Sequence, residues 1–140
     1  MDSQQSQEPV AVVERLLEAT NRHDLDAIGA CFELEFENVT PLHPARSFRG
    51  REQVRKNWAQ ILGAVPDIKA QIVGRAVAGD TIWAEWEMSG TRRDGVRHLL
   101  RGVMVFTVRA GHIHALRFYL EPVDDSRLGI DAAVAQVVGL

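Results

Sequence analysis

The chain has 140 residues, 46% of them hydrophobic, a net charge of −3 and one cysteine. This length predicts one domain with a core that needs no metal or disulfide, and we expect no cofactor. Acids and bases are interspersed, which excludes the basic surface of a nucleic-acid-binding protein. With the single Cys31, no membrane-length apolar run and a polar stretch at residues 1–7, we expect a cytoplasmic protein without a signal peptide or membrane contact.

The pattern of the N-terminal half predicts helices that follow a disordered segment at residues 1–8. Pro9 is typical of a first helical turn, and we expect a helix from there to Thr20. Asp24 can cap a second helix that runs to about Phe32. Alternation predicts a short strand over 33–40 with Leu34 and Phe36 on one side.

A proline-flanked loop containing His43 follows, then a third helix over 51–62 and a strand over 68–77. Three strand-like runs fill 81–121, joined by turns at 93–95 and 109–111 that each end in glycine. Three-residue loops at both turns place Arg92 opposite Val96 and Val108 opposite His112. Helices followed by antiparallel strands favour an α+β domain over 9–123, and the apolar tail 124–140 is consistent with a short helix.

Counting back from these turns sorts the side chains of the three strands onto two faces. One face is apolar and is expected to line a ligand cavity together with Leu16 of the first helix. Its cross-strand rows are Trp86, Gly102 and Phe118; Met88, Leu100 and Leu120; Met104 and Leu116; and Phe106 and His114. The other face carries Glu85, Glu87, Arg97, Arg101, Arg117 and Glu121.

Several strings together resemble one superfamily. They are Leu17-Glu18-Ala19-Thr20-Asn21-Arg22-His23-Asp24, Phe48-Arg49-Gly50-Arg51-Glu52, Ala84-Glu85-Trp86, Arg101-Gly102-Val103-Met104, Gly111-His112-Ile113 and Arg117-Phe118-Tyr119. Their order and spacing over residues 9–122 resemble the nuclear-transport-factor-2-like superfamily, in its SnoaL-like, polyketide-cyclase branch. The resemblance implies a cone-shaped α+β barrel, in which a strongly curved, mostly antiparallel sheet wraps three helices around a deep pocket. It does not fix the chemistry.

This chain lacks the catalytic residues of two activities known in that superfamily. Ketosteroid isomerases need a tyrosine, an aspartic acid and an aspartate base where this chain has Leu16, Gly102 and Asn38. Leucine and glycine side chains donate no hydrogen bond, and an amide cannot exchange protons at neutral pH. Limonene-type epoxide hydrolases share only Asn38 with this chain, because their other four positions fall on Phe36, Trp86, Met88 and Phe118.

Two functions therefore remain open. One is a SnoaL-like cyclase or isomerase that moves protons on a hydrophobic, aromatic or polyketide-like substrate, with His114, Asn38 and His98 as candidate catalytic residues. The other is a non-catalytic binding protein or accessory subunit for an apolar ligand. The candidate ligand-binding residues are Leu16, Phe36, Trp86, Met88, Leu100, Gly102, Met104, Leu116 and Phe118.

Three further residues carry specific expectations. Gly102 either leaves a void that admits a ligand or marks a bend in the sheet. Glu121 is expected to point outward toward Arg101 as an ordinary surface pair. His43 is expected in a loop near the pocket mouth.

The outer face of the sheet mixes charged side chains with Trp83, Val105 and Ala115, which the predicted register places side by side. Soluble proteins usually cover such an apolar patch. We therefore expect a homodimer through this face, as the resemblance also implies.

Overall fold

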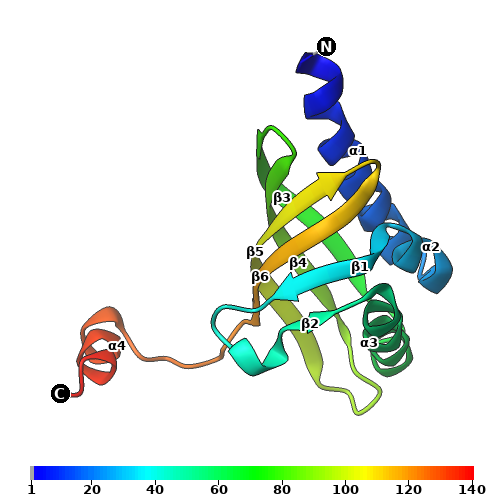
Figure 1. Cartoon of the computed structure of the whole chain (residues 1–140). Coiled ribbons are helices and arrows are strands. Elements are labelled where there is room, and N and C mark those ends of the chain that lie inside the picture. Colours follow the sequence, from blue (N-terminus) through cyan, green and yellow to red (C-terminus); the bar gives the residue numbers. More distant parts are fainter. Residues whose placement is uncertain (1) are drawn as a thin grey trace.

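Three helices pack against one side of a curved six-stranded sheet (Figure 1). The structure is a computed structural model that describes the backbone of residues 2–140 and the side chains from Glu8 onward. The helices that pack on the sheet are α1 (Asp2–Asn21), α2 (Leu25–Ala30) and α3 (Arg51–Ala64). A fourth helix, α4 (Ile130–Val137), lies at the end of the tail, away from the sheet. No helix in the described part of the chain is long and apolar enough to cross a membrane.

The sheet has the strand order β2-β1-β6-β5-β4-β3. Its strands are β1 (Phe32–Val39), β2 (Phe48–Arg49), β3 (Lys69–Ala78), β4 (Thr81–Thr91), β5 (Arg97–Arg109) and β6 (His112–Pro122), with a 3₁₀ turn, η1 (Pro44–Arg46), between β1 and β2. Every neighbouring pair is antiparallel except β1 and β6, which run parallel. The predicted α+β class and curved sheet are confirmed.

The predicted start of α1 is wrong. The helix begins at Asp2 and contains Pro9, although residues 1–8 were expected to be a disordered lead; Met1 lies outside the described residues. The predicted cap of α2 is confirmed, since the Asp24 carboxylate accepts a 3.0 Å hydrogen bond from the Ala27 amide. Asn21 then ties the end of α1 to the edge strand β3 through two hydrogen bonds with the backbone of Ala70.

The β4–β5 hairpin has the predicted register. Trp86 pairs with Gly102, and Met88 pairs with Leu100. Gly95 ends the turn with a φ of 84°, and the Arg92 amide donates to the Val96 carbonyl, as a three-residue loop requires. Trp86 is 1% exposed while Glu85 is exposed, so the apolar face does point toward the helices.

The predicted β5–β6 register is wrong by two residues, and two local features explain the shift. The turn has a two-residue loop, since Arg109 pairs with His112 and both Ala110 and Gly111 have positive φ, typical of a type I′ turn. An irregularity at Thr107/Val108 then leaves His114 as an extra, unpaired residue on β6.

The new register changes which residues face inward. Met104 pairs with Phe118 and Gly102 with Leu120, and Ile113 is fully buried. A shift of two preserves the alternation of side chains between faces, so Leu116 and Leu120 remain on the inner face. On β1 a similar irregularity separates two residues that were expected to share a face: Phe36 is 1% exposed and Leu34 is 65% exposed.

Gly102 marks the closest approach of β5 to β6. A Cβ atom at this position would lie 2.1 Å from the Tyr119 carbonyl oxygen and 2.9 Å from the Leu120 Cα. The space beside Gly102 is therefore filled by the backbone of β6. This finding supports the interpretation as a bend of the sheet and corrects the expectation that a ligand contacts Gly102.

We predict that Gly102→Ala destabilises the protein by about 3 kcal/mol or more, because the methyl group would push two strand backbones apart. Gly63→Ala is the matched control, since a Cβ at Gly63 would meet no atom within 4 Å and alanine favours the α3 helix. Urea unfolding of both variants measures the difference. Equal stability of the two variants would contradict the close approach.

Candidate functional site

A cavity of about 250 Å³ lies between α3 and the inner face of the sheet, bounded by β1, β2 and the ends of β4, β5 and β6. Three of its wall residues are phenylalanines that pack edge to face. The ring centroids of Phe32 and Phe36 are 4.7 Å apart, and those of Phe36 and Phe48 are 6.0 Å apart. The complete lining is Phe32, Phe36, Asn38, Thr40, Arg46, Phe48, Val54, Asn57, Trp58, Ile61, Met88, Leu100, Leu116, Phe118 and Glu121.

Five of the nine expected ligand-binding residues lie in this wall: Phe36, Met88, Leu100, Leu116 and Phe118. Three others, Leu16, Trp86 and Met104, are buried in the core but do not line the cavity. The indole N–H of Trp86 is buried and makes no hydrogen bond with any described residue. Gly102 is covered by β6, as described above.

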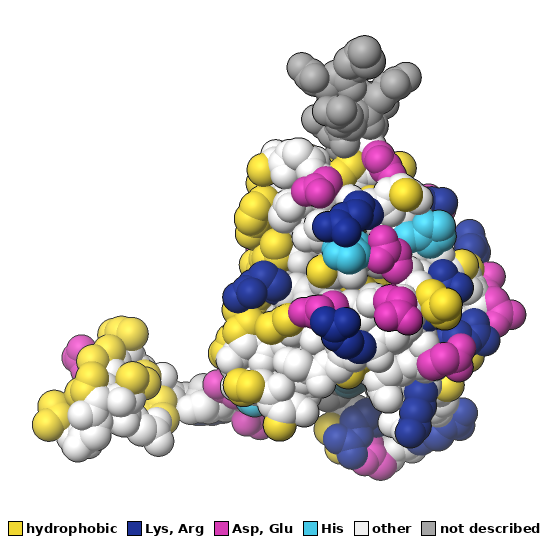
Figure 2. All heavy atoms as spheres, in the orientation of Figure 1, with side chains coloured by type: hydrophobic (Ala, Val, Ile, Leu, Met, Phe, Trp, Pro, Cys, Tyr) yellow, Lys and Arg dark blue, Asp and Glu magenta, His cyan; other side chains and the backbone are white. Residues whose placement is uncertain are grey.

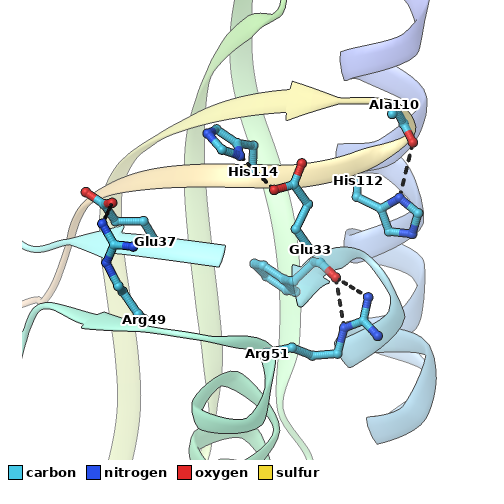
Figure 3. Close-up of polar contacts among 8 residues, drawn as sticks. Glu33, Glu37, Arg49, Arg51, Ala110, His112 and His114 are labelled. Carbon is cyan, nitrogen blue, oxygen red and sulfur yellow. Dashed lines mark hydrogen bonds and ion pairs between the residues drawn. The ribbon is translucent and has the colours of Figure 1, made fainter. Parts of the chain in front are cut away.

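The candidate acid–base residues are separated in space. Asn38 lines the cavity and is 5% exposed. His114 does not line it: the residue lies at the β6 irregularity, and its Nδ1 is 2.7 Å from a carboxylate oxygen of Glu33 (Figure 3). His98 is also absent from the cavity wall.

His98 sits in a partly buried position on β5, where it pairs with Gly90. Its Nε2 is buried and has no hydrogen-bond partner among the described residues. Burial lowers the pKa of His98, and the positive charge of Arg92 lowers it further. Folding therefore disfavours the protonated form of this imidazole.

Sequence reasoning missed Glu121 as a residue of the cavity wall. Glu121 was expected to point outward toward Arg101, but Arg101 donates to Glu87 at 2.8 Å instead. The Glu121 carboxylate lies 2.8 Å from Nε2 of His43, and Glu121 is part of the cavity lining. Both side chains of this pair are about one-third exposed, at 36% for His43 and 34% for Glu121.

The loop between β1 and β2 holds His43 in place through its own hydrogen bonds. The His43 amide donates to the Thr40 carbonyl, and the Arg46 amide donates to the His43 carbonyl. The Thr40 amide donates to the Ser47 hydroxyl at 3.0 Å, which closes the loop. Asn38 precedes this loop, and one of its amide hydrogens is donated to the Thr40 hydroxyl at 3.0 Å.

The parallel pairing of β1 and β6 explains why these residues meet. Asn38 pairs with Leu116 and Val39 with Arg117, so the carboxyl ends of the two strands lie at the same edge of the site. The loop that follows β1 therefore passes the end of β6, where Glu121 is located. The sequence signal for this contact was weak, because it needs the parallel register of two strands far apart in the chain.

Among the described residues, no group of three or more His, Cys, Asp or Glu side chains is placed to hold a metal ion. The polar residues of the cavity wall are Asn38, Thr40, Arg46, Asn57 and Glu121. The Glu121 carboxylate has the His43 imidazole beside it, and the second amide hydrogen of Asn38 can be donated to a ligand. This combination can carry a proton and stabilise a developing negative charge on oxygen.

A family model for the SnoaL-like domain matches residues 13–116. The chain belongs to the SnoaL-like family. Among curated proteins, none shows significant sequence similarity to it.

Solved structures share the fold at low sequence identity. A putative SnoaL-like polyketide cyclase from Jannaschia sp. CCS1 is 18% identical, with a TM-score of 0.71 and 84% of this chain and 88% of that chain covered. A limonene-epoxide-hydrolase-like epoxide hydrolase from M. tuberculosis is 19% identical, with a TM-score of 0.71 and coverage of 96% and 98%. TsrD from Streptomyces laurentii is 20% identical, with a TM-score of 0.68 and coverage of 83% and 88%. At these identities the likeness shows the fold alone.

We predict a pH-dependent contribution of His98 to stability. Because its pKa is lowered by folding, the unfolded chain binds this proton more readily, and the free energy of unfolding falls as the pH drops below about 6.5, the ordinary value for histidine. His98→Leu removes this contribution. Urea unfolding between pH 8 and pH 5 should show a shallower decline for the variant than for the parent; parallel curves would contradict the assignment.

Proposed function

We propose that this protein binds a hydrophobic, aromatic or polyketide-like carbonyl compound in the cavity and transfers a proton on it, as a SnoaL-like cyclase or isomerase would. The observation that carries the proposal is that Glu121, which is paired with His43, lines the same largely apolar cavity as Asn38. The structural neighbour from Jannaschia sp. CCS1 is described as a putative polyketide cyclase, and the proposed reaction belongs to that class.

The apolar wall suits a small ligand with a ring or a short chain. The cavity volume of about 250 Å³ lies just below the ~300–1,000 Å³ range of ligand pockets. The edge-to-face packing of the phenylalanine rings makes this part of the cavity wall rigid, because each ring is held by its neighbour. These features favour a rigid, flat substrate over a long flexible one.

The polar end supplies an acid–base group and a hydrogen-bond donor. In the proposed reaction the Glu121 carboxylate removes a proton from the carbon next to the substrate carbonyl. The electron pair moves to the carbonyl oxygen, and the free amide hydrogen of Asn38 donates to the resulting enolate oxygen. The His43 imidazole donates its Nε2–H to Glu121, which orients the carboxylate.

The enolate can then react in two ways without any further cofactor. Protonation at another carbon by the Glu121 carboxylic acid gives an isomer. Attack of the enolate carbon on a second carbonyl of the same molecule closes a ring, and the new alkoxide takes up the proton. Both routes restore the ionised Glu121 and share the first step.

A test of the first step needs only a small carbonyl probe. With 1-tetralone in D₂O, we predict that the protein exchanges the hydrogens on the carbon next to the carbonyl, measured by ¹H NMR. Glu121→Gln should lower this rate by roughly 10²–10⁴-fold, because the general base is lost. His43→Gln should lower it by less, because the carboxylate remains.

The second His–Glu pair of the structure provides the matched control. His114 and Glu33 lie 2.7 Å apart with exposures of 34% and 29%, close to those of the cavity pair, but they are outside the cavity wall. Glu33→Gln and His114→Gln should leave the exchange rate unchanged. Exchange that depends on His114 and not on Glu121 would overturn the assignment, and saturable binding of the probe without any exchange would favour the non-catalytic binding protein.

A further inference from the structure

Arg46 brings a positive charge to the wall of the cavity, and the proposed reaction does not use this charge. The residue ends η1, in the loop between β1 and β2, and it lines the cavity although it is exposed to solvent. No carboxylate among the described residues forms an ion pair with its guanidinium group. A guanidinium group stays charged at every physiological pH, so Arg46 offers the cavity a permanent cation.

The arginines that follow Arg46 in the chain have partners of their own. Arg49 pairs with Glu37 at 2.7 Å (Figure 3). Arg51 donates to the Phe32 carbonyl oxygen at 2.9 Å. Neither of these two arginines lines the cavity. Arg46 differs from both, because it lines the cavity and has no acidic partner in the described part of the chain.

The carboxylate of the cavity wall does not neutralise Arg46. Glu121 pairs with Nε2 of His43 at 2.8 Å instead, and His43 lies on the same loop as Arg46. The Arg46 amide donates to the His43 carbonyl at 2.8 Å, which holds the two residues in one turn. The loop therefore carries one basic side chain that contacts Glu121 and a second that lines the cavity without contacting it.

A buried hydroxyl group at the start of this loop adds a hydrogen-bond donor. Thr40 lines the cavity and is 4% exposed. Its Oγ1 accepts a 3.0 Å hydrogen bond from Asn38, so the hydrogen of the hydroxyl group remains to be donated. The Thr40 amide donates to the Ser47 hydroxyl at 3.0 Å, and Ser47 directly follows Arg46. This bond ties the two ends of the loop together and keeps both donors in one structural unit.

The surface around the cavity does not attract an anion by itself. Acidic and basic side chains are interspersed over the face that carries β1, β2 and α3 (Figure 2). The whole chain has a net charge of −3. Selection of an anionic ligand therefore depends on Arg46 at short range and not on a broad positive field.

We propose that the ligand of this cavity carries a carboxylate that binds to Arg46, so that the substrate is a cyclic or aromatic keto acid. This inference rests on the proposed function, because it adds an acid group to the carbonyl compound proposed above. A planar carboxylate matches the guanidinium fork and forms charge-assisted hydrogen bonds with it. The ring then lies against the apolar wall, and Arg46 offsets the repulsion between the substrate carboxylate and Glu121.

Binding of matched acids and esters tests the proposal. The probes are the regioisomeric carboxylic acids of 1-tetralone, each compared with its own methyl ester by isothermal titration calorimetry at low ionic strength. At least one acid should bind about 10-fold more tightly than its ester, because of the charge-assisted contact. Added salt should reduce this preference, because Arg46 is exposed. If no acid binds more tightly than its ester, the proposal is wrong.

Substitution of Arg46 assigns the preference to this residue. Arg46→Gln should weaken binding of the preferred acid about 10-fold and leave the Kd of the ester unchanged. Arg46→Lys should retain part of the preference, because the charge remains without the fork. Arg49→Gln is the matched control, since Arg49 is a neighbouring exposed arginine outside the cavity wall, and it should bind both probes as the parent does. A preference for the acid that survives Arg46→Gln would overturn the proposal.

The same probes separate this inference from the proposed reaction. Glu121→Gln should lower hydrogen exchange but keep the preference for the acid, since Arg46 is intact. A parent protein that binds an acid selectively without exchanging its hydrogens would contradict the reaction and support the carboxylate site. Exchange of the 1-tetralone hydrogens without a preference for any acid would support the reaction and overturn the carboxylate site.

Discussion

The parallel pairing of β1 with β6 is the constraint on which the site depends. Every other pair of neighbouring strands is antiparallel. Those pairs alone would not bring the loop after β1 to the cavity. By aligning Asn38 with Leu116, the parallel pair places the end of β1 and the end of β6 at the same place. The loop after β1 then delivers His43 to Glu121.

The structure contains two similar His–Glu pairs in different surroundings. His114 and Glu33 are about one-third exposed, and neither lines the cavity. Glu121 lines the largely apolar cavity and is paired with His43, and both side chains are about one-third exposed. The presence of a His–Glu pair therefore says less about function than whether the pair lies at the cavity.

The sequence predicted those parts of the fold that are determined by local patterns. The α+β class, the Asp24 cap and the β4–β5 register follow from spacing within a few residues or across one turn. The β5–β6 register failed because a two-residue turn and an unpaired His114 each shifted the pairing by one. Neither feature has a strong local signature in the sequence. Ala110 has a positive φ, which alanine rarely adopts.

The site was predicted less well for the same reason. The apolar residues Phe36, Met88 and Leu116 follow from alternation, which a register shift of two does not disturb. Glu121 and His43 lie at an end of a strand and in a loop, where alternation gives no direction. Their contact depends on the pairing of segments about 80 residues apart in the chain, which local patterns do not contain.

A crystal structure of the protein with 1-tetralone bound would test the central claim most directly. The account predicts the carbonyl oxygen within hydrogen-bond distance of the Asn38 Nδ2 atom and the adjacent carbon facing the Glu121 carboxylate, with the ring against Phe36 and Phe48. A ligand bound in the cavity with its carbonyl group turned toward α3 and away from Asn38 and Glu121 would contradict the account.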